Sequence, residues 1–117
     1  MTLYDLSLVE AMGKKDPGFV AAVLNLFLES IPVDLAQLNL SLAQKDWKEL
    51  AFVAHQLKST IDTLGVNSLS ETIRLIEAAN EDNNANQQTL QLNIDKVTAV
   101  LNEVVGELKV KFPASVN

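Results

Sequence analysis

The side chain best suited to covalent chemistry in this chain of 117 residues is its single histidine, His55, because the sequence contains no cysteine. An unperturbed imidazole is largely neutral and nucleophilic near neutral pH. His55 lies in the segment AHQLKSTIDTLG, which spans residues 54–65, so Lys58 and Ser59 follow it by three and four positions. A lysine one helical turn away is within reach of a group bonded to the ring, and a small serine leaves that ring approachable. These residue types suit phosphoryl transfer onto a ring nitrogen.

Helical periodicity predicts that His55 faces solvent. With Ala54 set at zero and 100° per residue, the apolar residues of this segment fall between about 260° and 340°; they are Leu50, Val53, Leu57, Ile61 and Leu64. His55 falls near 100°, with Lys58, Ser59 and Asp62 on the same face. This disfavours a core histidine. A surface histidine without a role stays open on periodicity alone.

Phe52 falls near 160° on the same wheel, on the exposed side. An apolar ring beside the histidine suits a docking surface for a partner protein. Packing beneath the first helix explains it equally well.

The elements that position these residues are all predicted to be helices. A short first helix over 5–12 ends at Gly13, and Asp16-Pro17 begins the second. Its apolar stripe continues to Leu42, with a kink or break expected at Pro32. Asp46 to Glu49 resembles a capping box, and the helix it opens ends at Gly65.

Further along, 68–71 (Ser-Leu-Ser-Glu) reads as a second capping box that opens a helix to about residue 80. The polar stretch 80–86 is predicted to be a loop. A last helix carries its apolar residues over 90–108 in alternating steps of four and three, and Pro113 follows its end. The fold class is therefore all-α: an antiparallel four-helix bundle with an additional short N-terminal helix, forming one domain over 1–117. A coiled coil is disfavoured, because turn signals recur every ~15 to 30 residues, as in helices that fold back.

Composition narrows the classes of function. A formal net charge of −6 and an isoelectric point near 4.6 disfavour nucleic acid and anionic membrane surfaces as partners. Metal binding lacks a second histidine or any cysteine. The longest apolar stretch, Phe19 to Leu28, is interrupted by Asn25, and the N-terminus lacks signal-peptide features, so we expect no membrane association and a cytoplasmic location. No Walker-type glycine loop is present, which argues against an ATP-driven kinase.

The segment from His55 through Lys58 to Gly65 resembles the signature of histidine phosphotransfer (HPt) domains. Members of that family carry the acceptor histidine, a lysine three positions on, usually a glycine at four, and a glycine at ten. The resemblance covers nearly the whole chain, and its specific part is the phosphotransfer motif over 46–77. It implies the same antiparallel four-helix bundle with an exposed histidine.

The resemblance also implies residue roles. His55 would accept a phosphoryl group from an aspartyl phosphate on a receiver domain and pass it to another receiver in a multistep two-component phosphorelay. Lys58 would stabilise the phosphoryl group, and Glu77 would hydrogen-bond the imidazole and orient it. The chain would be a phosphocarrier, not a kinase or ATPase, with no cofactor of its own and magnesium supplied by the partner receiver. Partners would be response-regulator receivers and a hybrid sensor histidine kinase, with the chain itself a monomer.

Two positions depart from the family pattern. The usual glycine at the fourth position is Ser59, which enlarges the surface beside the ring. Asp62 is expected to form an ion pair with Lys58 four positions back, in competition with the phosphoryl group. Both keep open an alternative in which the chain binds a receiver or kinase and sequesters it without accepting phosphate.

Receiver docking is expected to involve the first helix, through Leu6, Val9 and Met12, together with Phe52. Those three residues of the first helix equally suit capping of the bundle core. A helical assembly module is a third reading, and it would need a large exposed apolar patch or stable self-association. Met1 and the full set of helices favour a free-standing protein over a piece of a sensor kinase.

Overall fold

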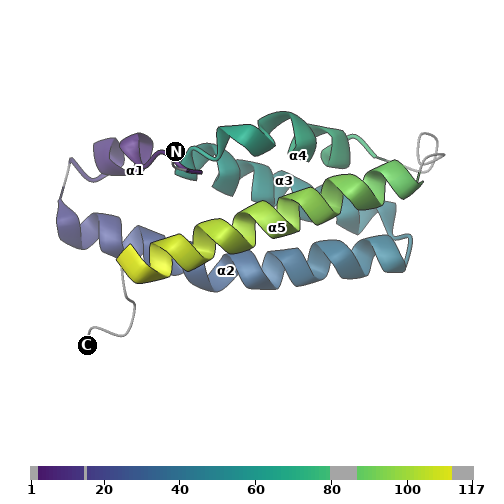
Figure 1. Cartoon of the computed structure of the whole chain (residues 1–117), viewed down its shortest axis with the longest axis horizontal. Coiled ribbons are helices and arrows are strands. Elements are labelled where there is room, and N and C mark those ends of the chain that lie inside the picture. Colours follow the sequence, from purple (N-terminus) through teal and green to yellow (C-terminus); the bar gives the residue numbers. More distant parts are fainter. Residues whose placement is uncertain (1–2, 15, 80–86, 112–117) are drawn as a thin grey trace.

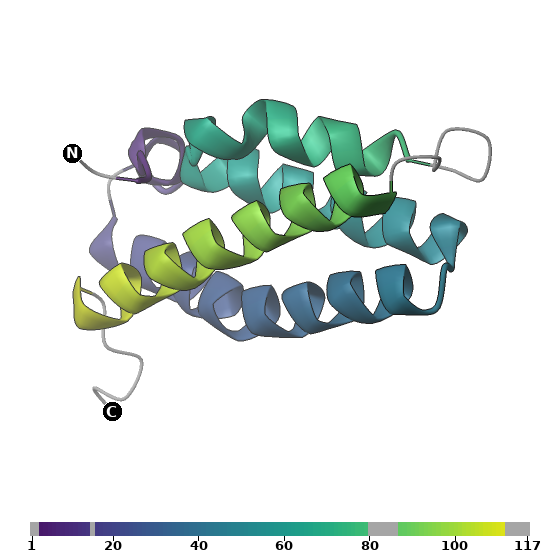
Figure 2. The same ribbon diagram turned by 45° about the vertical axis from the view of Figure 1, so that its right-hand side comes forward.

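The computed structural model of the chain describes residues 3–14, 16–79 and 87–111, and every regular element in those ranges is helical. The all-α prediction is therefore confirmed. Four helices pack around a shared core: α2 (Pro17–Ala43), α3 (Trp47–Leu64), α4 (Ser70–Glu77) and α5 (Gln87–Lys111). Each contacts the next in the chain, α5 returns to α2, and consecutive helices run in opposite directions (Figure 1). The short α1 (Ser7–Met12) packs at the end of the bundle where α3 ends (Figure 2).

The core of the bundle is aliphatic, as expected for a chain with only 5% aromatic residues. One face of α3 is almost completely buried, and its largest contributors are Leu50, Leu57, Ile61 and Leu64. Burial of each such side chain stabilises the fold by roughly 1.5–3 kcal/mol. This packing sets the rotation of α3 about its own axis. The face opposite, which carries His55, is thereby fixed toward solvent.

Both ends of α3 are closed by the residues that the sequence indicated. The Asp46 carboxylate accepts a hydrogen bond from the Glu49 backbone N–H at 3.2 Å, which caps the first turn. At the other end Gly65 adopts φ = 64°, the left-handed conformation that favours glycine. A side chain at Gly65 would also overlap the backbone of Asp5, whose N–H donates to the Leu64 carbonyl at 2.9 Å. Gly65 therefore serves two structural purposes: it ends α3 and admits the N-terminal segment.

One local prediction is wrong. The capping box over 68–71 does not form, because residues Asn67–Leu69 make a 3-10 turn, η1, and α4 begins at Ser70 without a side-chain cap. That turn places Leu69 completely in the core. Burial of this side chain stabilises the fold by more than the roughly 1 kcal/mol that a side-chain cap would contribute. At Pro32, where the sequence predicts a kink or break without loss of the helix, α2 continues through the proline, which lies on the exposed side. The predicted loop over 80–86 and Pro113 lie outside the described residues.

Helix α2 is long and apolar enough to cross a membrane, with a mean hydropathy of 1.7 over its most apolar 18 residues. The sequence argument based on Asn25 considered only a shorter stretch. In the bundle, α2 buries one side in the core, including Leu24, Ile31 and Leu38. A core helix of a bundle passes the same test of length and composition, so this result does not show a membrane span.

Candidate functional site

His55 lies midway along α3, and 68% of its side chain is exposed. Leu57 and Ala54, its neighbours on the buried side, are both fully covered. The imidazole is therefore presented to solvent by a helix whose opposite face is anchored, as the periodicity predicted. A large molecule can approach the ring without any rearrangement of the core.

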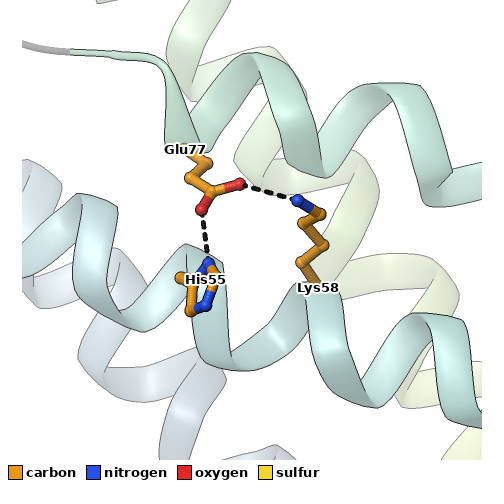
Figure 3. A network of polar contacts seen from close by, with 3 residues as sticks. All are labelled: His55, Lys58 and Glu77. Carbon is orange, nitrogen blue, oxygen red and sulfur yellow. Dashed lines mark hydrogen bonds and ion pairs between the residues drawn. The ribbon is translucent and has the colours of Figure 1, made fainter.

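The carboxylate of Glu77, at the end of α4, joins the two basic side chains of α3. His55 Nδ1 lies 2.6 Å from Glu77 Oε2, and Lys58 Nζ lies 3.5 Å from Glu77 Oε1. Figure 3 shows both side chains directed at one carboxylate, with the second ring nitrogen of His55 pointing away from Glu77. These three residues form the His55–Glu77–Lys58 cluster. It depends on the packing of α4 against α3, because Glu77 is remote from His55 in the sequence.

Electrostatics keeps Glu77 ionised within this cluster. The hydrogen bond from His55 lowers the pKa of Glu77 below its ordinary value of 4.5; burial opposes this shift, and the nearby positive charge of Lys58 lowers the pKa further. An ionised carboxylate only accepts hydrogen bonds. The proton of the short bond must therefore reside on Nδ1, which leaves the lone pair of a neutral ring on Nε2.

The two residues that depart from the family pattern are both exposed on the His55 face. Asp62 does not pair with Lys58, so the expected ion pair is wrong. Lys58 instead reaches across to Glu77 on the neighbouring helix, a partner that a helical wheel of α3 alone cannot include. Ser59 lies on the exposed side next to His55, and Gly65 lies at the helix end, where its conformation has the structural role described above.

The residues proposed for docking separate into exposed and buried groups. Phe52 is 58% exposed on α3 and is remote from α1, which contacts the opposite end of that helix, so packing beneath α1 is excluded. Met12 is also exposed. Val9 is fully buried, and its proposed role as a docking contact is wrong because α1 uses it to cover the end of the core. Leu6 is partly buried against the same core.

A shallow recess beside the cluster adds residues that were not singled out as site residues. It lies between the start of α3 and the end of α4 and is lined by Lys48, Ala51, Glu77 and Ala78, among others. Lys48 and Ala51 precede His55 by seven and four positions, so helical spacing alone places them along its face. Ala78 lies at the end of α4, and no spacing in the sequence relates it to His55. Within the described ranges, no group of three or more His, Cys, Asp or Glu side chains is arranged to hold a metal ion.

Comparison with known families bears directly on this site. A family model described as Hpt domain matches residues 22–108, which is most of the chain and includes the whole cluster. The chain belongs to the Hpt domain family. Members of that family are phosphocarriers that act in histidine phosphotransfer within phosphorelays and interact with receiver domains. No curated protein and no solved structure matches the chain. The matched region of this Hpt domain excludes α1, so the family assignment rests on the four helices of the bundle.

Proposed function

We propose that this Hpt domain accepts a phosphoryl group on Nε2 of His55 from a receiver-domain aspartyl phosphate and passes it to the aspartate of another receiver. The observation that carries the proposal is the 2.6 Å contact between His55 Nδ1 and the Glu77 carboxylate. That contact occupies one ring nitrogen and leaves the other free, on an exposed ring. A histidine without a role has no need of such orientation.

In the forward step the lone pair of Nε2 attacks phosphorus, and the bond from phosphorus to the aspartyl oxygen breaks with its electron pair leaving on the receiver's carboxylate. No proton has to move. The ring keeps its proton on Nδ1 and gains a positive charge as the N–P bond forms. Glu77, already bonded to Nδ1, stabilises that charge. The reverse step, with a second receiver's carboxylate as nucleophile, follows the same path.

Lys58 is proposed to stabilise the phosphoryl oxygens. Its ammonium group is half-buried and is held near the ring by Glu77 at 3.5 Å, a distance typical of an ion pair without a tight hydrogen bond. The incoming phosphoryl group offers a more highly charged acceptor on the same side. Lys58 is therefore placed to turn from Glu77 to the phosphoryl group with little loss.

The partners we propose are response-regulator receivers, one of them within a hybrid sensor histidine kinase, and the magnesium for the reaction belongs to the receiver. Phe52, exposed one turn before His55, offers an apolar contact for the receiver surface. We place the protein in the cytoplasm, where receivers operate. In this proposal the chain carries phosphate without kinase or ATPase activity of its own.

The test is phosphoryl transfer from a radiolabelled phospho-receiver to the wild-type chain and to His55→Gln. We expect acid-labile, base-stable label on the wild type and none on the variant, with unchanged helical circular dichroism because the side chain is exposed. Label retained on His55→Gln would overturn the assignment of the acceptor. Tight receiver binding without label on either protein would favour the sequestering alternative.

A further inference from the structure

The outer face of α2 carries a continuous apolar stripe that the bundle leaves uncovered. Four large side chains recur every seven residues along it and are 39–67% exposed: Phe19, Leu26, Val33 and Leu40. A second row, also exposed and spaced by seven, lies beside the first and consists of Ala22, Glu29, Ala36 and Ala43. Together these eight residues form what we call the outer stripe. Only 28% of the most apolar 18-residue window of α2 is buried, so core packing leaves much of its hydrophobicity unexplained.

The two rows alternate in steps of four and three, which is the spacing of a helix that packs against another helix. One row is large and the other is small, apart from Glu29. Residues at these positions project opposite the buried side of α2, which includes Leu24 and Ile31. Helices α3 and α5 pack against the core side of α2, and α1 contacts α2 near its start, where Phe19 lies against Gly13. The outer stripe thus has the pattern of a helix-pairing surface without a partner.

We propose that the outer stripe is a self-association surface, on which α2 pairs with α2 of a second copy of this chain in antiparallel orientation. The twofold axis of the pair is placed level with Ile31. A residue that precedes Ile31 by some number of positions in one copy then faces the residue that follows Ile31 by the same number in the other copy. Large then meets small at three of the four steps: Phe19 faces Ala43, Leu26 faces Ala36 and Leu40 faces Ala22. At the fourth, close to the axis, Val33 faces Glu29. The stripe is complementary to its own reversed sequence, which a surface for an unrelated partner has no reason to be.

Charge separates the two orientations at Glu29. Helix α2 contains no basic residue to pair with it. Parallel pairing would set Glu29 against Glu29 and large side chains against large ones, whereas antiparallel pairing sets Glu29 against Val33. At the helix ends, antiparallel pairing places Asp16 of one copy beside both Lys45 and Asp46 of the other, so these exposed charges do not distinguish the orientations. The second copy in antiparallel orientation is therefore the occupant that fits the sizes of the stripe.

The interface would be small. A helix of 27 residues is about 40 Å long, and a contact about 10 Å wide covers roughly 400 Å² on each copy. The total of roughly 800 Å² lies below the range of stable complexes, so the dimer should be weak and reversible. It departs from the monomer expected from the sequence. Because α2 lies diagonally across the bundle from α4 (Figures 1 and 2), the dimer leaves the His55–Glu77–Lys58 cluster open.

Sedimentation equilibrium at increasing protein concentration tests the proposal independently of phosphotransfer. We expect a reversible monomer–dimer equilibrium for the wild type and at least tenfold weaker dimerisation for Leu26→Glu. Leu92→Glu is the matched control, since Leu92 is equally exposed but lies on α5, and it should dimerise as the wild type does. Circular dichroism checks that each variant keeps its helices. A wild type that stays monomeric at several hundred micromolar, or that binds lipid vesicles instead, would overturn the proposal.

Cysteine pairing tests the orientation, because the chain has no native cysteine. Leu26→Cys and Ala36→Cys chains, mixed under oxidising conditions, should form a disulfide between the two different chains. Either variant alone should form little, because identical positions lie about 15 Å apart along the axis in the antiparallel pair. Rapid disulfide formation by Leu26→Cys alone would contradict the antiparallel arrangement.

Discussion

The outer faces of α3 and α2 differ, although both helices bury their inner faces in the same core. The outer face of α3 is polar apart from Phe52 and carries His55 and Lys58, beside which α4 places Glu77. The outer face of α2 is apolar, with Glu29 as its one charged residue within the stripe. An exposed polar face costs nothing in water and can hold reactive groups, whereas an exposed apolar face is favourable only when something covers it. The first face suits chemistry with a transient partner and the second suits association.

The largest expected effect separates the two sides of α2. Leu24→Ala removes a fully buried side chain and should lower the free energy of unfolding by about 2–5 kcal/mol. Leu26→Ala, two residues on but exposed, should change it by less than about 0.5 kcal/mol in dilute solution. Urea denaturation followed by circular dichroism measures both. Equal losses would show that Leu26 also belongs to the core.

On α3 the largest effect should come from removing the carboxylate that orients the ring. Glu77→Ala should slow phosphoryl transfer by roughly 10- to 100-fold, comparable to the loss of other groups that orient a reacting histidine. Glu77→Gln keeps an acceptor for the Nδ1 proton and should recover part of the rate, which a purely structural role would not predict. Rapid-quench kinetics gives the rates. Glu71→Gln, on the exposed first turn of α4, is the control and should transfer normally.

A smaller effect is expected for the lysine. Lys58→Ala should reduce the transfer rate by about five- to tenfold, since a half-exposed charged hydrogen bond contributes about 1 kcal/mol. Lys48→Ala removes a charge from the same face of α3 about two turns before His55, and serves as the control. If both variants slow transfer equally, the effect reflects general charge attraction and not contact with the phosphoryl group.

The pH dependence of stability should reveal Glu77. Because the pKa of Glu77 is lower in the folded than in the unfolded chain, its contribution is fully present above pH 4.5 and is lost as the pH falls through the folded value. The contribution should be about 0.5 kcal/mol or less, because solvent screens the cluster. Stability measured for wild type and Glu77→Gln should therefore differ at pH 6 and converge in strong acid. A difference that grows in acid would contradict this sign.

The smallest effect is expected for Asp62→Asn. Since Lys58 pairs with Glu77, removal of the Asp62 charge should change stability by less than about 0.5 kcal/mol and leave the transfer rate within twofold. A markedly longer lifetime of phosphohistidine in this variant would instead show that Asp62 repels the phosphoryl group through solvent.

Periodicity predicted α3 well because its two faces contrast in polarity and both ends carry recognisable signals, Asp46 and Gly65. The partner of Lys58 was missed because Asp62 is a neighbour in sequence, whereas Glu77 becomes a neighbour only when α4 packs. Val9 was wrongly predicted to be a docking contact for a related reason. The sequence of a short helix identifies its apolar residues, but it does not reveal whether they face a core or solvent.

The outer stripe was not predicted from the sequence because the two sides of α2 do not differ in polarity. With apolar residues on both sides of α2, a wheel identifies the core stripe from Leu24 to Leu42 and assigns no meaning to the remainder. The seven-residue spacing of Phe19, Leu26, Val33 and Leu40 is legible in the sequence. Only the packed bundle shows that those four are the ones left outside.

The caps at both ends of α3 have a consequence for hydrogen exchange. Helices open from their ends, and His55 lies nine residues from Asp46 and ten from Gly65, as far from either end as the helix allows. Amide protons near His55 should therefore exchange only through global unfolding and be among the slowest in the chain. On this expectation the reactive side chain sits on backbone that opens only when the whole fold opens, so any adjustment needed for receiver docking falls to the receiver and to side chains.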